Sequence, residues 1–124
     1  MQRARGVKIG QGCYIGPYVH IDLLYPDLVT MEDNVAIGSN SMIFAHVNPA
    51  ANLELKKNHY PRKIEPVLLK SGTWINPKCI ITLGTTMGKN SVLSIGSVAV
   101  TPIPDNCVAV GNPARSVKKL TDNN

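Results

Sequence analysis

The sequence predicts an all-β domain whose parallel strands wind into a three-sided prism. Aliphatic residues recur at every sixth position, and aromatic residues make up only 5% of the 124 residues, so small aliphatic side chains must fill the core. A period of six fits neither an α-helix nor a plain hairpin array, whereas it suits a prism in which each hexapeptide forms one face and one turn. The length matches one domain, which we place at residues 1–124.

The six-residue period falls into groups of three hexapeptides. Its aliphatic positions are Ile9, Ile15, Ile21, Met31, Ile37, Ile43, Leu69, Ile75, Ile81, Met87, Leu93 and Ala99. Because three hexapeptides close one coil, the sequence predicts about four triangular coils, at residues 7–24, 29–46, 67–84 and 85–102. The aliphatic side chains of successive coils would then form ladders inside the prism.

Two interruptions of the period predict segments that leave the prism. A short insertion at about residues 24–28 predicts a bulge, and a much longer one predicts a protruding loop at about residues 47–66. Insertions as long as the second are usually functional. After the fourth coil, Pro102 and Pro104 cannot donate ladder hydrogen bonds, so we expect a short C-terminal tail at about residues 103–124, outside the repeat.

The net charge of +5 does not by itself indicate a nucleic-acid partner. No recognised nucleic-acid motif is present, and most cations lie in the predicted loop or tail, namely Lys56, Lys57, Arg62, Lys63, Arg115, Lys118 and Lys119. A phosphorylated small molecule is an equally good partner. No apolar run approaches the roughly 20 residues needed to cross a bilayer. We therefore expect neither a nucleic acid nor a membrane as a partner.

The cysteines indicate a reducing environment. Cys13, Cys79 and Cys107 are an odd number without C-x-x-C spacing, and no segment like a signal peptide follows Met1. We expect free thiols and a cytoplasmic location.

Four segments of the chain resemble a known family. They are WINP at residues 74–77, LGTTMGKN at 83–90, IGSV at 95–98 and VGNPAR at 110–115. Together with the six-residue period, they are similar to the C-terminal half of the hexapeptide-repeat acyltransferases, and within that family to the galactoside, maltose and xenobiotic O-acetyltransferases. The resemblance implies a left-handed parallel β-helix, a homotrimer, and acetyl transfer from acetyl-CoA to a small-molecule acceptor without a metal.

His46 ends the second predicted coil and matches the family's catalytic histidine. The resemblance implies that one ring nitrogen removes the proton of an acceptor hydroxyl, which attacks the thioester directly, while a carbonyl or carboxylate holds the other nitrogen. Histidine suits this role because its side chain exchanges protons near neutral pH. Asp22 is a candidate for binding an acceptor hydroxyl, although aspartate is also common in turns. His20 and His59 are expected at solvated surface positions.

The resemblance also implies contacts to coenzyme A from five residues. Trp74 matches a residue beside the pantetheine channel, and packing at an interface is an alternative role for its ring. Ile95 stands where the family usually has alanine, and Val100 where a hydroxyl side chain is common, which favours backbone contacts at both. Arg115 and Lys118 match basic positions that meet the phosphates, a task that flexible cations suit.

Three alternatives remain open at this stage. The first is N-acetylation of an amino sugar, because no residue in the sequence names the acceptor. The second is a non-catalytic β-helix scaffold, since a fold does not dictate a function. The third is a zinc enzyme of the γ-carbonic anhydrase type, which needs two histidines five residues apart near His46, whereas residue 51 is Ala. Metal analysis tests the third, and coenzyme A binding separates the enzyme from the scaffold.

Overall fold

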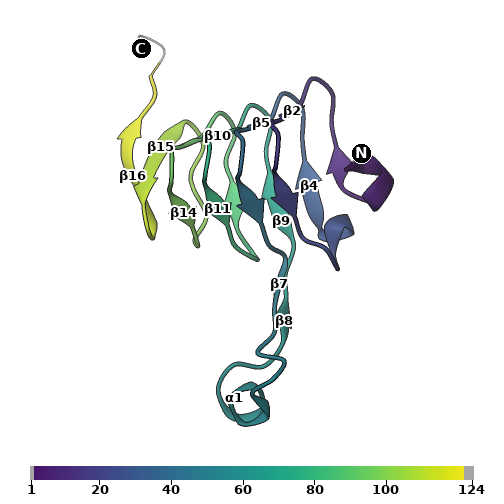
Figure 1. Cartoon of the computed structure of the whole chain (residues 1–124). Coiled ribbons are helices and arrows are strands. Elements are labelled where there is room, and N and C mark those ends of the chain that lie inside the picture. The colour runs from purple at the N-terminus through teal and green to yellow at the C-terminus, as the bar shows by residue number, and fades with distance from the viewer. Residues whose placement is uncertain (1, 122–124) are drawn as a thin grey trace.

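The computed structural model describes residues 2–121, which consist mainly of short strands stacked in parallel sheets (Figure 1). The first sheet has the order β1 (Lys8–Ile9), β4 (Val29–Met31), β9 (Val67–Leu69) and β12 (Thr86–Met87). The second has the order β2 (Tyr14–Ile15), β5 (Ala36–Ile37), β10 (Trp74–Ile75), β13 (Val92–Leu93), β15 (Cys107–Gly111) and β16 (Ala114–Lys119). The third has the order β3 (His20–Ile21), β6 (Met42–Ile43), β11 (Ile80–Ile81) and β14 (Val98–Ala99).

The predicted aliphatic ladders form the core between these sheets. In the third sheet, Ile21 pairs with Ile43, Ile43 with Ile81 and Ile81 with Ala99, and all four side chains are fully buried. This confirms the inward phase that the six-residue period predicted. Ile9 and Ile15 are only half-buried, because they belong to β1 and β2, the strands at one end of their sheets.

The turns between strands need residues that tolerate a left-handed backbone. Asn34, Asn40 and Asn90 occupy such turns with φ of 59°, 60° and 55°. Asparagine adopts this conformation more readily than other residues with a Cβ atom, because its short amide bonds to the local backbone. The turn residues therefore agree with the prism that the period predicts.

The long insertion forms a distinct projection, the arm, which we define as residues 46–64. Its base is the antiparallel pair of β7 (His46–Val47) and β8 (Lys63–Ile64), and its far end carries α1 (Leu53–Asn58). Figure 1 shows the arm extending away from the sheets. The Asn52 side chain caps α1 by accepting a hydrogen bond of 2.8 Å from the Leu55 N–H. The predicted all-β chain is thus nearly all-β, with one short α-helix in the arm.

Two 3₁₀-helices complete the helical segments, η1 (Arg3–Arg5) and η2 (Pro26–Leu28), the latter between β3 and β4. None of the helices within residues 2–121 is long and apolar enough to cross a bilayer.

The tail departs from the six-residue period but stays in the second sheet. β15 pairs in parallel with β13 and antiparallel with β16. Because side chains alternate along a strand, Ala109 is buried while Val110, the next residue, is exposed. We expected the tail to lie outside the repeat, and β15 and β16 instead extend one of its sheets. Residues 122–124 of the predicted tail lie outside the described residues.

Candidate active site

The stacking of strands brings Asp22 and His46 into contact. Asp22 directly follows β3, and His46 opens β7 shortly after β6. Since β3 pairs with β6 in the third sheet, the two residues meet although 24 positions separate them. His46 Nδ1 lies 2.6 Å from Asp22 Oδ2. We call this pair the dyad.

Asp22 is held as a carboxylate at the back of the dyad. Its side chain is fully buried, and its Oδ1 accepts hydrogen bonds of 2.9 Å from the N–H groups of Leu24 and Tyr25. Its Oδ2 accepts a hydrogen bond of 2.7 Å from the Ala45 N–H as well as the contact with His46. Burial alone would raise the pKa of this carboxyl, but the hydrogen bonds from Ala45, His46 and Leu24 and the charge of His46 lower it below its ordinary value.

The charge on Asp22 determines which ring nitrogen of His46 carries the proton. An ionised carboxylate only accepts hydrogen bonds, so Nδ1 must be the donor in the contact with Asp22. In the neutral ring, Nε2 then keeps its lone pair. No other side chain within residues 2–121 hydrogen-bonds the ring, and 22% of the His46 side chain is exposed. Nε2 is therefore available to take a proton from an outside molecule.

Two residues that the sequence did not single out support the dyad. The Tyr25 ring meets the His46 ring edge-on, with centroids 5.3 Å apart. The Arg5 guanidinium donates hydrogen bonds of 2.8 Å and 2.6 Å to the carbonyl oxygens of Ile21 and Asp22. Tyr25 lies outside the six-residue period and Arg5 precedes it, so no sequence spacing indicated either contact.

A hollow of about 440 Å³ opens beside the imidazole. We call it the His46 hollow, and its lining residues are Phe44, His46, Val47, Asn48, Thr82 and Leu83. Thr82 and Leu83 follow β11, the neighbour of β6 in the third sheet. The hollow therefore gives the dyad a mostly apolar and open depression beside the imidazole.

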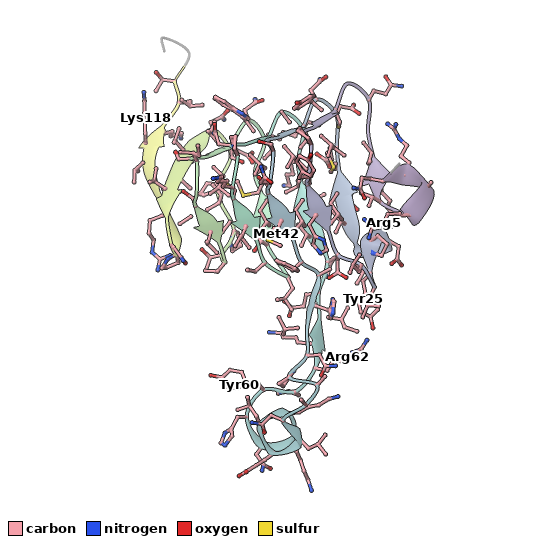
Figure 2. All side chains as sticks on the ribbon, viewed as in Figure 1. Arg5, Tyr25, Met42, Tyr60, Arg62 and Lys118 are labelled. Carbon is pink, nitrogen blue, oxygen red and sulfur yellow. The ribbon has the colours of Figure 1, made fainter. Side chains whose placement is uncertain are left out.

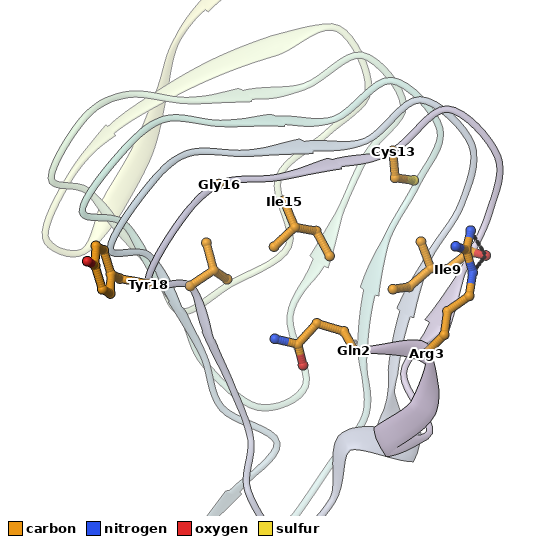
Figure 3. A pocket seen from close by; sticks show the side chains of 8 residues that line it. Gln2, Arg3, Ile9, Cys13, Ile15, Gly16 and Tyr18 are labelled. Carbon is orange, nitrogen blue, oxygen red and sulfur yellow. Dashed lines mark hydrogen bonds between the residues drawn. The ribbon is translucent and has the colours of Figure 1, made fainter.

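A second cavity of about 430 Å³ lies at the N-terminal end of the prism (Figure 3), and neither Asp22 nor His46 is among its lining residues. Ile9, Cys13 and Ile15 line it, and among residues 2–121 the strands β1 and β2 are the end strands of their sheets. The Arg3 guanidinium donates to the carbonyl oxygens of Ile9 and Gly10 at this end. The cavity therefore lies at the end of the stacked strands, away from the dyad.

The strand register places three of the predicted cofactor residues on one surface. Trp74 pairs with Val92, Val92 with Val108, and Val108 with Lys118 across the second sheet. Arg115 pairs with Val110, two residues beyond Val108, so it shares this outer face. Ile95 and Val100 are exposed just after β13 and β14. His46 follows the third sheet, so a single chain does not bring Trp74 to the dyad.

The remaining histidines differ in their surroundings. His59 is exposed at the end of α1, as predicted. His20 is half-buried, and its ring lies 5.6 Å from that of Phe44, so the prediction of a solvated position was wrong for this residue. Across residues 2–121, no three His, Cys, Asp or Glu side chains gather where they could hold a metal ion.

Comparisons with known proteins agree with this geometry. The galactoside O-acetyltransferase of Escherichia coli K12 is 33% identical over 117 residues, which make up 91% of this chain and 57% of that protein. A galactoside acetyltransferase solved in complex with coenzyme A is 30% identical, with a TM-score of 0.73 over 93% of this chain and 60% of that one. The chain is therefore similar to the hexapeptide-repeat acyltransferases over more than nine tenths of its length. No single family model matches it.

A third comparison shows the shared fold of these hexapeptide-repeat acyltransferases at lower identity. A hexapeptide-repeat acetyltransferase from Vibrio cholerae O1 biovar eltor, complexed with acetyl coenzyme A, superposes with a TM-score of 0.75 at 22% identity. The match covers 98% of this chain and 75% of that one. The chain spans 57% of the length of its E. coli relative.

Proposed function

We propose that this chain carries the catalytic β-helix of an acetyl-CoA-dependent O-acetyltransferase acting on a small molecule. The observation that carries the proposal is the 2.6 Å contact between Asp22 and His46 at the edge of the His46 hollow. Three features favour catalysis over a scaffold role: the buried carboxylate, the available Nε2 and the similarity to acetyltransferases.

In the proposed reaction, the chain's own residues move one proton. His46 Nε2 takes the proton of the acceptor hydroxyl as its oxygen bonds to the thioester carbon, and the C–S bond then breaks. The imidazolium returns the proton to the departing sulfur, so the enzyme ends unchanged. Asp22 stabilises the imidazolium through Nδ1 and keeps the ring in one orientation. In this scheme Asp22 positions the His46 ring, rather than binding the acceptor hydroxyl as its place in the sequence suggested.

The proposed cosubstrate is acetyl-CoA, since two of the similar structures hold coenzyme A or its acetyl form. Trp74, Arg115 and Lys118 share one outer face, where an aromatic ring and two cations suit the pantetheine arm and the phosphates. Ile95 and Val100 are proposed to contact the pantetheine arm through their backbones. We also propose a cytoplasmic location, which is a reducing compartment in which the free thiols of Cys13, Cys79 and Cys107 would persist.

We further propose a left-handed β-helix of four triangular coils that assembles as a homotrimer. Two outer faces carry apolar rows in register, Tyr14, Ala36, Trp74, Val92 and Val108 on the second sheet and Met42, Ile80 and Val98 on the third. Tyr14 and Trp74 are more than half exposed in the single chain. A three-fold ring would place the second sheet of one subunit against the third sheet of the next, which would bring Trp74 to the dyad of a neighbour.

The test separates binding from transfer. Calorimetry with coenzyme A should give saturable binding to the wild type and, with equal affinity, to His46→Ala. Acetyl transfer to a panel of sugars and amines should fall in His46→Ala by about 10²–10⁴-fold, the usual contribution of a general base. His59→Ala is the matched control, because His59 is exposed on the arm and should leave the rate unchanged. An unchanged rate in His46→Ala removes the residue from catalysis, and absence of coenzyme A binding favours the scaffold.

A further inference from the structure

One cation of the arm is held directly beside the dyad. The Arg62 guanidinium carbon lies 5.2 Å from the centroid of the Tyr25 ring, and the same ring meets His46 edge-on at 5.3 Å. One aromatic ring therefore contacts both the guanidinium and the imidazole. Figure 2 shows Tyr25 and Arg62 at the root of the arm, where Arg62 immediately precedes β8.

No carboxylate within residues 2–121 pairs with Arg62. Its guanidinium makes no hydrogen bond there, and the Lys–Glu ion pair of the arm root joins Lys63 to Glu65 instead. Both oxygens of Asp22 are already occupied by other donors. An arginine presents five N–H donors in a planar fork, and the contact with the Tyr25 ring occupies none of them with a hydrogen bond.

A second guanidinium strengthens the positive charge on this side of the dyad. Arg5 lies on the same side of the arm root in Figure 2 and donates to the carbonyl oxygens of Ile21 and Asp22, as well as to Gln2 Oε1 at 2.6 Å. None of these partners is a carboxylate. Asp27, on the bulge, has its Cβ beside Gly6 and forms no ion pair among the described residues. Asp22 and Asp27 thus contribute negative charge near the two guanidinium groups, and Arg62 is the one of the two whose N–H donors are left without a partner among the described residues.

The groups around the imidazole differ in chemistry. The His46 hollow is lined by Phe44, Val47 and Leu83, which suit an acyl thioester, whereas the Tyr25 ring packs edge-on against the imidazole and holds Arg62 over its face. We infer that Arg62 binds a carboxylate or phosphate group of the acceptor, so that the substrate is an acidic hydroxyl compound. This inference rests on the proposed function. A carboxylate or phosphate fits the guanidinium fork in a bidentate way that a neutral sugar does not.

Binding of a simple anion tests the site without an acceptor. Inorganic phosphate is titrated into the wild type, Arg62→Gln and Lys57→Gln at constant ionic strength, and the NMR signals of the His46 and Tyr25 rings are followed. Lys57 is the matched control, because it is an exposed cation on α1 of the same arm. Saturable shifts in the wild type and Lys57→Gln, weakened at least about tenfold in Arg62→Gln, support the inference. Absent shifts, or equal affinity in Arg62→Gln, overturn it.

Matched acceptors test the role in transfer. Methyl glucoside and methyl glucuronide share three ring hydroxyls and differ in a carboxylate, and glucoside 6-phosphate adds the phosphate case. For each charged acceptor that the wild type acetylates, Arg62→Gln should lower kcat/KM at least about tenfold, while Arg62→Lys should lower it less. The rate with the neutral glucoside should not change. An equal loss with all three compounds would show that Arg62 only positions the arm, and it would overturn the inference.

Coenzyme A also carries phosphates, so its binding is measured in a separate experiment. Affinities for coenzyme A and for acetylpantetheine, which lacks the nucleotide phosphates, should be the same in the wild type and Arg62→Gln. A selective loss of coenzyme A affinity would assign Arg62 to the cofactor and overturn the inference. Transfer without any preference for charged acceptors would overturn this inference and leave the proposed function standing. Absence of coenzyme A binding, with intact phosphate shifts, would overturn the proposed function and leave the anion site standing.

Discussion

The prism and the arm use opposite ways of holding residues in place. In the prism, each strand is hydrogen-bonded to strands of neighbouring coils, and inward side chains such as Ile43 are fully buried. The arm projects from the sheets, and none of the residues of α1 is buried. His46 and Asp22 lie where the two regions meet. The comparison suggests that the prism fixes the geometry of the dyad, whereas the arm supplies groups that face the substrate at little cost to folding.

The largest difference between the regions is expected in stability. Ile37→Ala removes a fully buried side chain that pairs in register with Ile15 and Ile75. We expect a loss of about 2–5 kcal/mol in the free energy of unfolding, because a cavity remains in a close-packed core. Leu53→Ala is the control in the arm, since Leu53 is 74% exposed, and it should change stability by less than about 0.5 kcal/mol. Urea unfolding at one protein concentration measures the free energy of unfolding of both variants. Equal losses in the two variants would contradict the difference in stability between the prism and the arm.

A smaller effect should appear in the pH dependence of stability. The pKa of Asp22 lies below its ordinary value of 3.8 in the folded chain, so the unfolded chain binds this proton more tightly. The stabilisation is therefore complete above the unfolded value and is lost as the pH falls through the folded value. Thermal unfolding between pH 6 and pH 2.5 should show a steeper loss in the wild type than in Asp22→Asn. Parallel curves would mean that Asp22 is not held as a carboxylate.

The periodic part of this architecture was accessible from the sequence. Each ladder position points into the core in every coil and therefore needs an apolar side chain in every coil. The burial of residues such as Ile21, Ile43 and Ile81 can thus be predicted from their spacing alone. The helix of the arm was missed, although Asn52 is a favoured N-cap residue and residues 53–57 are good helix formers. The extension of the second sheet by β15 was also missed. Pro102 and Pro104 predict the end of strand pairing, whereas pairing resumes after them and buries Ala109.

The candidate site was predictable only in part. The family resemblance identified His46 as the catalytic histidine, whereas Asp22 was predicted to bind the acceptor or to serve only as a turn residue. The signal for their contact was present, since Ile21 and Ile43 occupy the same ladder and each is followed closely by one member of the dyad. Arg62 and Tyr25 meet across the arm root, outside any repeat, so spacing carried no information about them.

The most direct test of the account concerns the protonation of one ring. We measure the ¹⁵N chemical shifts of the His46 imidazole by NMR in the wild type at a pH where the ring is neutral. The account predicts that Nδ1 carries the proton and that Nε2 is unprotonated, because the Asp22 carboxylate accepts from Nδ1. This measurement needs neither an acceptor nor a cofactor. A neutral ring with its proton on Nε2 would contradict the account, since no lone pair would then face the substrate.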